Sequence, residues 1–217
     1  MRTQILEAAT RLFAAKGYEG ASLSAIAERV GIRKASLLYH FSTKDDLHRA
    51  VLDGILTRWN DVLPRLLEAA AGEDRFEAIL DETVGFFVAD PDRARLLLRE
   101  ALDRPEAMRA RLDAAVRPWL GVIAASIRRG QETGDLRAEC DPEAYVLQII
   151  HLVVGGIAIT DTLSTALDEG PGSPDTERLV TELKRLARAG LFTPAGLARL
   201  SERRARSSSR GLATGGR

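Results

Sequence analysis

The stretch that decides the fold is residues 31–47, GIRKASLLYHFSTKDDL. Just before it, Ser22 or Ser24 can cap a short amphipathic helix, which Gly31 ends. Residues 33–40 resume the helical period after only a few turn residues. A short helix, a glycine turn and a second short helix together predict a helix-turn-helix.

Outward from this stretch, almost every segment repeats at the helical period, which predicts an all-α protein. We expect the first helix to stop at Lys16-Gly17, and we expect Ser42 to cap a long fourth helix that runs to about residue 72 and links two halves. Further helices are predicted at about 74–89, 92–102, 105–130 with a kink or split at Pro118, 142–167 and 175–189.

The charge of the chain is balanced overall but uneven along its length. The sequence has 31 basic and 31 acidic residues, yet residues 1–50 carry eight Lys or Arg against five Asp or Glu. A basic start joined to an acidic middle suggests that the two parts do different work. With one cysteine, no secretory leader and no apolar run long enough to cross a bilayer, we expect a cytoplasmic protein without a membrane partner.

The second short helix carries the groups that a DNA-reading helix needs. In a helix-turn-helix its N-terminal residues meet base edges in the major groove, and flanking groups hold phosphates. Arg33 and Lys34 can reach guanine acceptors, and Ala35 is small enough for close approach. We expect Leu37 and Phe41 to point inward. The predicted donors to phosphate are Ser36, Tyr39, His40 and Lys44.

The N-terminal quarter of the chain resembles the DNA-binding domain of the TetR family of bacterial transcriptional regulators. The resemblance rests on Leu12-Phe13, the KGY turn at 16–18, IAERVGI at 26–32 and LYHFSTKDDL at 38–47. It implies base reading by Arg33, Lys34, Ala35 and Leu38. It implies phosphate contacts from Ser24, Ser36, Tyr39, His40 and Lys44. Leu38 departs from the family, which very often has tyrosine there, and leucine cannot donate to a phosphate.

The resemblance also implies a homodimeric repressor that a small molecule releases from a palindromic operator on double-stranded DNA. We expect a DNA-binding domain at 1–47, a helical ligand-binding and dimerisation domain at 48–192, and a basic, disordered tail at 193–217. The helix from Pro142 is apolar almost all round, which favours self-association. The expected walls and polar strip of an apolar effector cavity are Trp59, Phe86, Phe87, Leu98, Trp119, Ile123, Tyr145, Gln148 and His151.

Two other classes of function stay open at this point. One is an enzyme acting on a small molecule, although the sequence has no phosphate loop, nucleophile elbow or clustered metal ligands, so we expect no catalytic site, metal or cofactor. The other is a ligand-independent architectural DNA binder that uses its arginine tail. We also expect His48 to be a solvated surface group and His151 an interior one.

Overall fold

The computed structural model describes residues 1–69, 73–166, 175–199 and 201–202. Within these ranges the chain is helical and has no strand, apart from one isolated antiparallel bridge between Leu136 and Phe192. The all-α prediction is confirmed. The helices are α1 Arg2–Gly20, α2 Leu23–Val30, α3 Lys34–His40, α4 Lys44–Ala69, α5 Glu73–Val88, α6 Pro91–Asp103, α7 Pro105–Glu132, α8 Pro142–Ala158, α9 Thr160–Leu163 with the 3-10 turn Ser164–Ala166, and α10 Asp175–Leu191.

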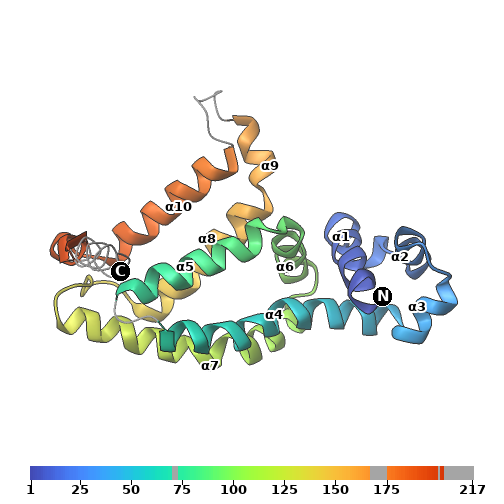
Figure 1. Ribbon diagram of the computed structural model, residues 1–217, viewed down its shortest axis with the longest axis horizontal. Coiled ribbons are helices and arrows are strands. Elements are labelled where there is room, and N and C mark those ends of the chain that lie inside the picture. The colour runs from blue at the N-terminus through green and yellow to red at the C-terminus, as the bar shows by residue number, and fades with distance from the viewer. Residues whose placement is uncertain (70–72, 167–174, 200, 203–217) are drawn as a thin grey trace, which may run out of the picture.

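Helices α1, α2 and α3 form one end of an elongated molecule, and α4 runs from that end along the rest (Figure 1). Helices α5, α6, α7 and α8 gather beside the far part of α4, while α9 and α10 lie on the opposite side from α4 and α7. One cluster of buried side chains extends from Ile5 in α1 to Ala187 in α10. The predicted domain boundary at residue 47 therefore stays a prediction.

The local signals at the N-terminal end act largely as predicted. Gly17 interrupts α1 with φ 70° and ψ 177°, a backbone conformation that glycine adopts without a steric penalty. The Ser22 hydroxyl accepts a hydrogen bond from Ala25 N at 3.1 Å and so caps α2. The predicted cap of α4 was wrong by one residue, because Thr43 Oγ1, not Ser42, accepts from Asp46 N at 3.0 Å.

Pro118 neither splits nor ends α7, which continues from Pro105 to Glu132. A proline inside a helix leaves the carbonyl four residues earlier without its helical donor. Both Pro118 and Ala114 are exposed, so water can take the place of the missing N–H group. The predicted split was therefore wrong, and the alternative of a kink at Pro118 stays a prediction.

The helix predicted at 142–167 is instead two segments that meet at an angle of 65°. Helix α8 ends at Ala158, whose carbonyl accepts a hydrogen bond from Arg95 Nε of α6 at 3.2 Å. The same guanidinium donates through Nη2 to Asp161 Oδ2 at 2.5 Å. Arg95 thus stabilises a helix end here, a long-range contact that helical periodicity cannot report. Residue 167 lies outside the described residues.

The predicted tail does not begin at residue 193. Residues 194–199 are helical, and the Thr193 hydroxyl donates to Gly134 O at 2.9 Å. Leu197 packs against the buried cluster around Phe192 and Leu136. These contacts hold the segment against the chain that follows α7. Residues 200 and 203–217, which make up most of the predicted tail, lie outside the described residues.

Candidate nucleic-acid interface and ligand cavity

Helix α3 is anchored by one face and presents the other to solvent. Gly31 ends α2 in the left-handed region with φ 75°, and Arg33, two residues later, is the N-cap residue of α3. Within α3 only Leu37 is buried, and Phe41 is buried directly after the helix ends. The inward direction predicted for these two side chains is confirmed. Both side chains belong to the buried cluster that also contains residues of α1 and α4, so they anchor α3 to these helices.

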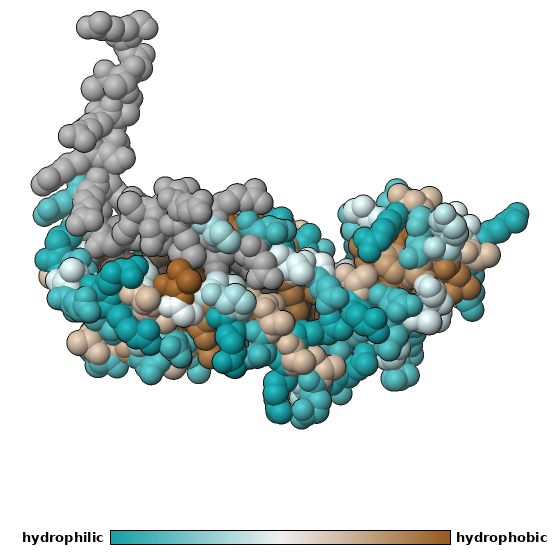
Figure 2. All heavy atoms as spheres, turned by 90° about the horizontal axis from the view of Figure 1, so that it is seen from below, coloured by the Kyte–Doolittle hydropathy of each residue, from teal (hydrophilic) through white to brown (hydrophobic). Residues whose placement is uncertain are grey.

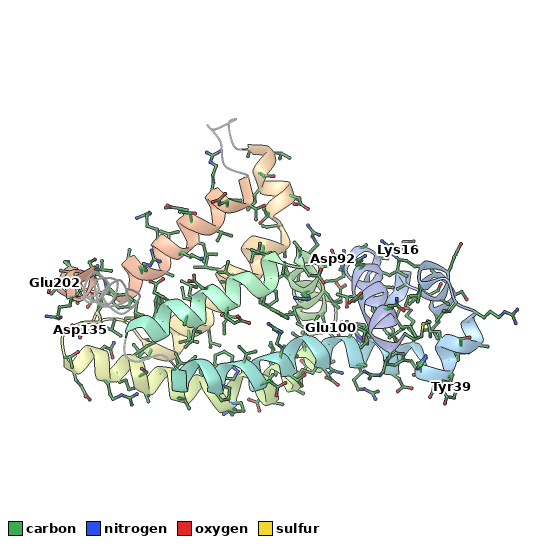
Figure 3. The ribbon with its side chains drawn as sticks, viewed as in Figure 1. Lys16, Tyr39, Asp92, Glu100, Asp135 and Glu202 are labelled. Carbon is green, nitrogen blue, oxygen red and sulfur yellow. The ribbon has the colours of Figure 1, made fainter. Side chains whose placement is uncertain are left out.

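The side chains predicted to meet DNA lie mostly on the free face of α3. Tyr39 is 88% exposed and points away from the other helices (Figure 3), and its ring lies 5.5 Å from that of half-buried His40. Leu38 is 38% exposed and offers an apolar contact. The other exposed members are Ser24, Arg33, Lys34, Ala35 and Ser36. Cations, hydroxyls and a phenol on one convex surface suit the groove and phosphates of DNA, and their individual roles stay predictions.

Lys44 is half-buried and already has partners within the protein. Its ammonium lies 4.3 Å from the centre of the Tyr18 ring and donates to Glu19 O at 3.4 Å. Arg104 lies over the same ring at 4.6 Å. A phosphate contact from Lys44 therefore competes with a cation–π contact and a weak hydrogen bond.

Arg2 is a cation near the recognition helix that the sequence analysis missed. Its guanidinium lies 5.1 Å from the centre of the Phe41 ring, next to the end of α3. In the sequence, Arg2 reads only as the start of the first helix. Its position depends on the packing of α1 against the residues after α3, which local pattern does not reveal.

His48 is buried, so its assignment to the surface was wrong. Only 2% of the residue is exposed, and its ring meets those of Phe13 and Tyr18 edge-on at 4.8 and 4.9 Å. Its Nε2 is 3.3 Å from Glu100 Oε2, and its Nδ1 is 3.4 Å from Arg104 Nη1. The imidazole thus joins α4 to α6 directly behind the DNA-binding helices.

Burial determines the charge state of this junction. It lowers the pKa of His48 to about 4, and nearby Arg104 and Arg111 lower it further than Asp45 raises it. Burial also raises the pKa of Glu100, against the opposing effect of Arg104. Both shifts favour the uncharged forms, because a charge loses its hydration when buried. The imidazole of His48 is therefore neutral, and its contact with Glu100 is not a full ion pair. In Figure 3, Glu100 is labelled on the side of α6 that faces the DNA-binding end.

A cavity of about 1430 Å³ lies among helices α4 to α8 and the residues at the end of α10. Six of the nine predicted ligand residues line it, namely Phe87, Leu98, Trp119, Ile123, Tyr145 and His151. Most of the wall is aliphatic or aromatic. Figure 2 shows one face of this part of the molecule, with apolar atoms visible in recesses between hydrophilic side chains.

Two predicted cavity residues lie elsewhere. The Phe86 ring is covered by the guanidinium groups of Arg58 and Arg93, at 5.0 and 4.4 Å from its centre. Gln148 is exposed and shares an outer stripe of α8 with Leu152, four residues later. Neither lines the cavity, so this cavity does not support the ligand-binding role that was predicted for them. The Trp59 side chain lies outside the described residues.

Two polar side chains of the wall depart from the expected strip. The Tyr145 hydroxyl donates to Ala187 O at 2.6 Å and so ties α8 to α10. His151 is exposed, so its prediction as an interior histidine was wrong. The cavity also uses residues that the sequence analysis did not select, including Leu56, Phe76, Leu97, Met108 and Ile149. Their helical periodicity indicated burial but not that the buried face would enclose a void.

Several large apolar side chains remain exposed on the far side of the molecule from α3. On α8 they are Leu147 and Leu152, at 48% and 46% exposure. Ile159 and Leu163 follow at 43% and 46%, and Leu186 of α10 is 50% exposed. Exposed apolar patches of this kind are uncommon on monomeric proteins and often mark an interaction surface.

Metal-binding clusters and membrane-spanning helices are two further features that bear on function. The described side chains include no group of three or more His, Cys, Asp or Glu able to hold a metal ion. In the same part of the chain no single helix is long and apolar enough to cross a membrane, although α8 and the bent segment after it reach the required length and composition together.

Comparisons with known proteins agree with this architecture. Residues 5–51 match the family model described as bacterial regulatory proteins, tetR family, and residues 97–168 match the tetracyclin repressor-like C-terminal domain. The regulator TtgR of Pseudomonas putida is 29% identical over 177 residues, which are 75% of this chain and 82% of the relative.

Two further matches cover the DNA-binding end and the fold. The negative regulator IcaR of the biofilm operon in Staphylococcus epidermidis is 37% identical over 65 residues, 30% of this chain and only 35% of the relative. The structure of the fatty acid degradation regulator FadR from Bacillus halodurans superposes with a TM-score of 0.67 at 19% identity, covering 87% of this chain and 95% of the other.

Proposed function

The chain belongs to the TetR family of bacterial regulatory proteins and is a DNA-binding transcriptional regulator, and from this premise we propose that it is a homodimeric repressor. A small, mostly apolar molecule in the cavity would release it from a palindromic operator. The two curated relatives described above are a negative regulator and a transcriptional regulator by name. Because its target would be bacterial DNA, the proposal includes a cytoplasmic location.

One observation carries the proposal: two helices that line the cavity also meet behind the DNA-binding helices. Leu56 of α4 and Leu97 of α6 line the cavity. On the same two helices, His48 and Glu100 touch each other against the ring of Phe13 in α1. A ligand that displaces α6 or α4 must therefore strain or shift the support of α3.

Dimerisation explains the exposed apolar side chains of α8 to α10. Two copies that bury Leu152 and Leu186 against each other would cover this surface and set the spacing of two recognition helices. Leu152→Glu should convert the dimer to a monomer in sedimentation at micromolar concentration. Leu102→Glu, at a 73% exposed leucine of α6, is the matched control and should leave the mass unchanged. A wild-type monomer would contradict the dimer.

The operator is tested by selecting duplexes from random DNA with the purified protein. We expect an inverted repeat whose half-sites lie about 34 to 36 Å apart, or a multiple of that spacing, because each subunit reads one major groove. Placed over a promoter, the selected site should lower transcription in the presence of the protein. Enrichment of no common sequence would favour the architectural alternative, and higher transcription would contradict repression.

A further inference from the structure

Most charged side chains around the cavity already have partners of opposite charge. Arg109 Nη1 lies 3.2 Å from Glu106 Oε2, and Arg117 Nε donates to Asp113 Oδ1 at 2.6 Å. Both pairs lie within α7, and all four side chains are more than half exposed. They form the rim of the cavity rather than its interior.

Two of the three remaining charges of the wall are paired in the same way. Glu143 accepts from Arg128 Nη2 at 2.9 Å, and the half-buried Asp135 accepts from Arg199 Nε at 2.5 Å. Arg129 is exposed. Among the described lining residues, none therefore places an unpaired charge in the interior. A carboxylate or an ammonium group buried there would lose its hydration without gaining a counter-ion.

The interior hydroxyl groups have already used their hydrogens. The Thr83 hydroxyl donates to Ile79 O at 2.5 Å, and the Tyr145 hydroxyl donates to Ala187 O. Burial raises the pKa of Tyr145, so its phenol keeps the proton that this bond requires. Each oxygen keeps a lone pair, so toward a ligand these two groups act as acceptors.

Donors are scarce in the interior part of the wall, because Arg109, Arg117, Arg129 and His151, which also line the cavity, are exposed residues. The Trp119 indole N–H is buried without a hydrogen-bond partner in the described part of the chain, and protein atoms enclose it on all sides. It cannot meet a ligand without a rotation of the ring. The half-buried Ser126 hydroxyl can either donate or accept. The interior thus offers more lone pairs than hydrogens.

From this polarity we infer that the cavity takes a neutral, largely apolar molecule carrying a hydroxyl or N–H donor, and rejects a carboxylate of the same shape. The inference rests on the proposed effector site and specifies the class of its ligand. The donor would bond to the oxygen of Thr83 or Tyr145 while the apolar part fills the aromatic and aliphatic space. A volume of about 1430 Å³ exceeds the roughly 300 to 1,000 Å³ of ordinary ligand pockets, so a long or multi-ring molecule fits.

Three probes of matched size test the class. They are 1-dodecanol, its isomer methyl undecyl ether, which lacks a donor, and dodecanoate, which carries a charge. Their binding is measured by competition with a neutral fluorescent dye. The pH is 8, because dodecanoate is then ionised and a histidine side chain with the usual pKa is neutral. We expect the alcohol to bind about three- to tenfold more tightly than the ether, from one net hydrogen bond. Dodecanoate should bind at least about tenfold more weakly than the alcohol.

The variants separate the hydrogen bond from general effects on the cavity. In the double variant Thr83→Val, Tyr145→Phe, the alcohol and the ether should bind equally. Thr57→Val is the matched control, because Thr57 makes the same type of bond to Asp53 O, at 2.7 Å, on the exposed side of α4. It should keep the full preference. Comparing alcohol with ether within each variant cancels any loss of stability common to both.

Several outcomes would overturn the inference. Dodecanoate binding as tightly as the alcohol would do so, as would an alcohol preference that is absent in the wild type or persists in the double variant. No binding of any probe would reject the cavity as the ligand site altogether. If the alcohol binds as expected but leaves operator binding unchanged, the ligand class stands and the proposed release mechanism fails.

Discussion

The junction between α4 and α6 predicts a specific pH dependence of stability. The pKa of buried His48 is lowered to about 4, against about 6.5 for histidine in an unfolded chain. The folded protein therefore binds fewer protons than the unfolded chain between these values. The free energy of unfolding therefore keeps the full contribution of neutral His48 above pH 6.5 and loses it as the pH falls toward 4. From the two pKa values, the loss between pH 7 and pH 5 is about 2 kcal/mol.

The effect of His48 must be measured as a difference between wild type and a His48 variant, because Glu100 changes the stability with pH in the opposite direction. Its raised pKa makes the folded state gain stability as the pH falls, and this gain is present whether or not His48 is replaced. Urea unfolding at fixed protein concentration should show that wild type loses about 2 kcal/mol more than His48→Gln between pH 7 and pH 5. His151→Gln, at an exposed histidine, is the control and should follow the wild type. Parallel curves for His48→Gln and wild type would refute the account of a neutral, buried junction.

Three further substitutions test the DNA-binding end. Lys34→Ala should cost about 1 to 3 kcal/mol on the selected operator and relax preference at one base position, and an equal loss on random DNA would reduce Lys34 to a phosphate contact. Lys44→Ala should weaken binding to both kinds of DNA and lower the salt slope by about one unit, whereas an unchanged slope would mean that its contacts with Tyr18 and Glu19 persist on DNA. Phe13→Ala, at a fully buried ring, should lower the free energy of unfolding by about 3 to 5 kcal/mol in urea titrations, and a loss below about 1 kcal/mol would contradict its role in the core.

The features that follow from local chemistry could be predicted from the sequence. The cap at Ser22, the turn at Gly31 and the inward face of Leu37 each depend on residues within a few positions, and each has the expected geometry. The pattern of α3 likewise placed the cations and hydroxyls on its free face. These features can be predicted without knowing which other helix packs against them.

The features that depend on contacts with distant elements could not be predicted from the sequence. His48 lies on the same buried face of α4 as Leu52 and Leu56, at four-residue steps. This spacing indicated burial, but the polarity of histidine favoured a surface position. The end of α8 depends on Arg95, more than 60 residues earlier, and no periodicity reports that. For the cavity, the sequence indicated apolar faces but not the residual space between them.

In the proposed mechanism, ligand binding in the cavity and binding of the operator oppose each other. The direct measurement is a titration of a cavity ligand, such as 1-dodecanol if it binds, into the protein alone and into the protein saturated with operator. We expect the ligand to bind the operator complex more weakly, by the same factor by which it weakens operator binding, because coupling between two sites is reciprocal. Equal ligand affinities in the two titrations would contradict the claim, however tightly the ligand binds.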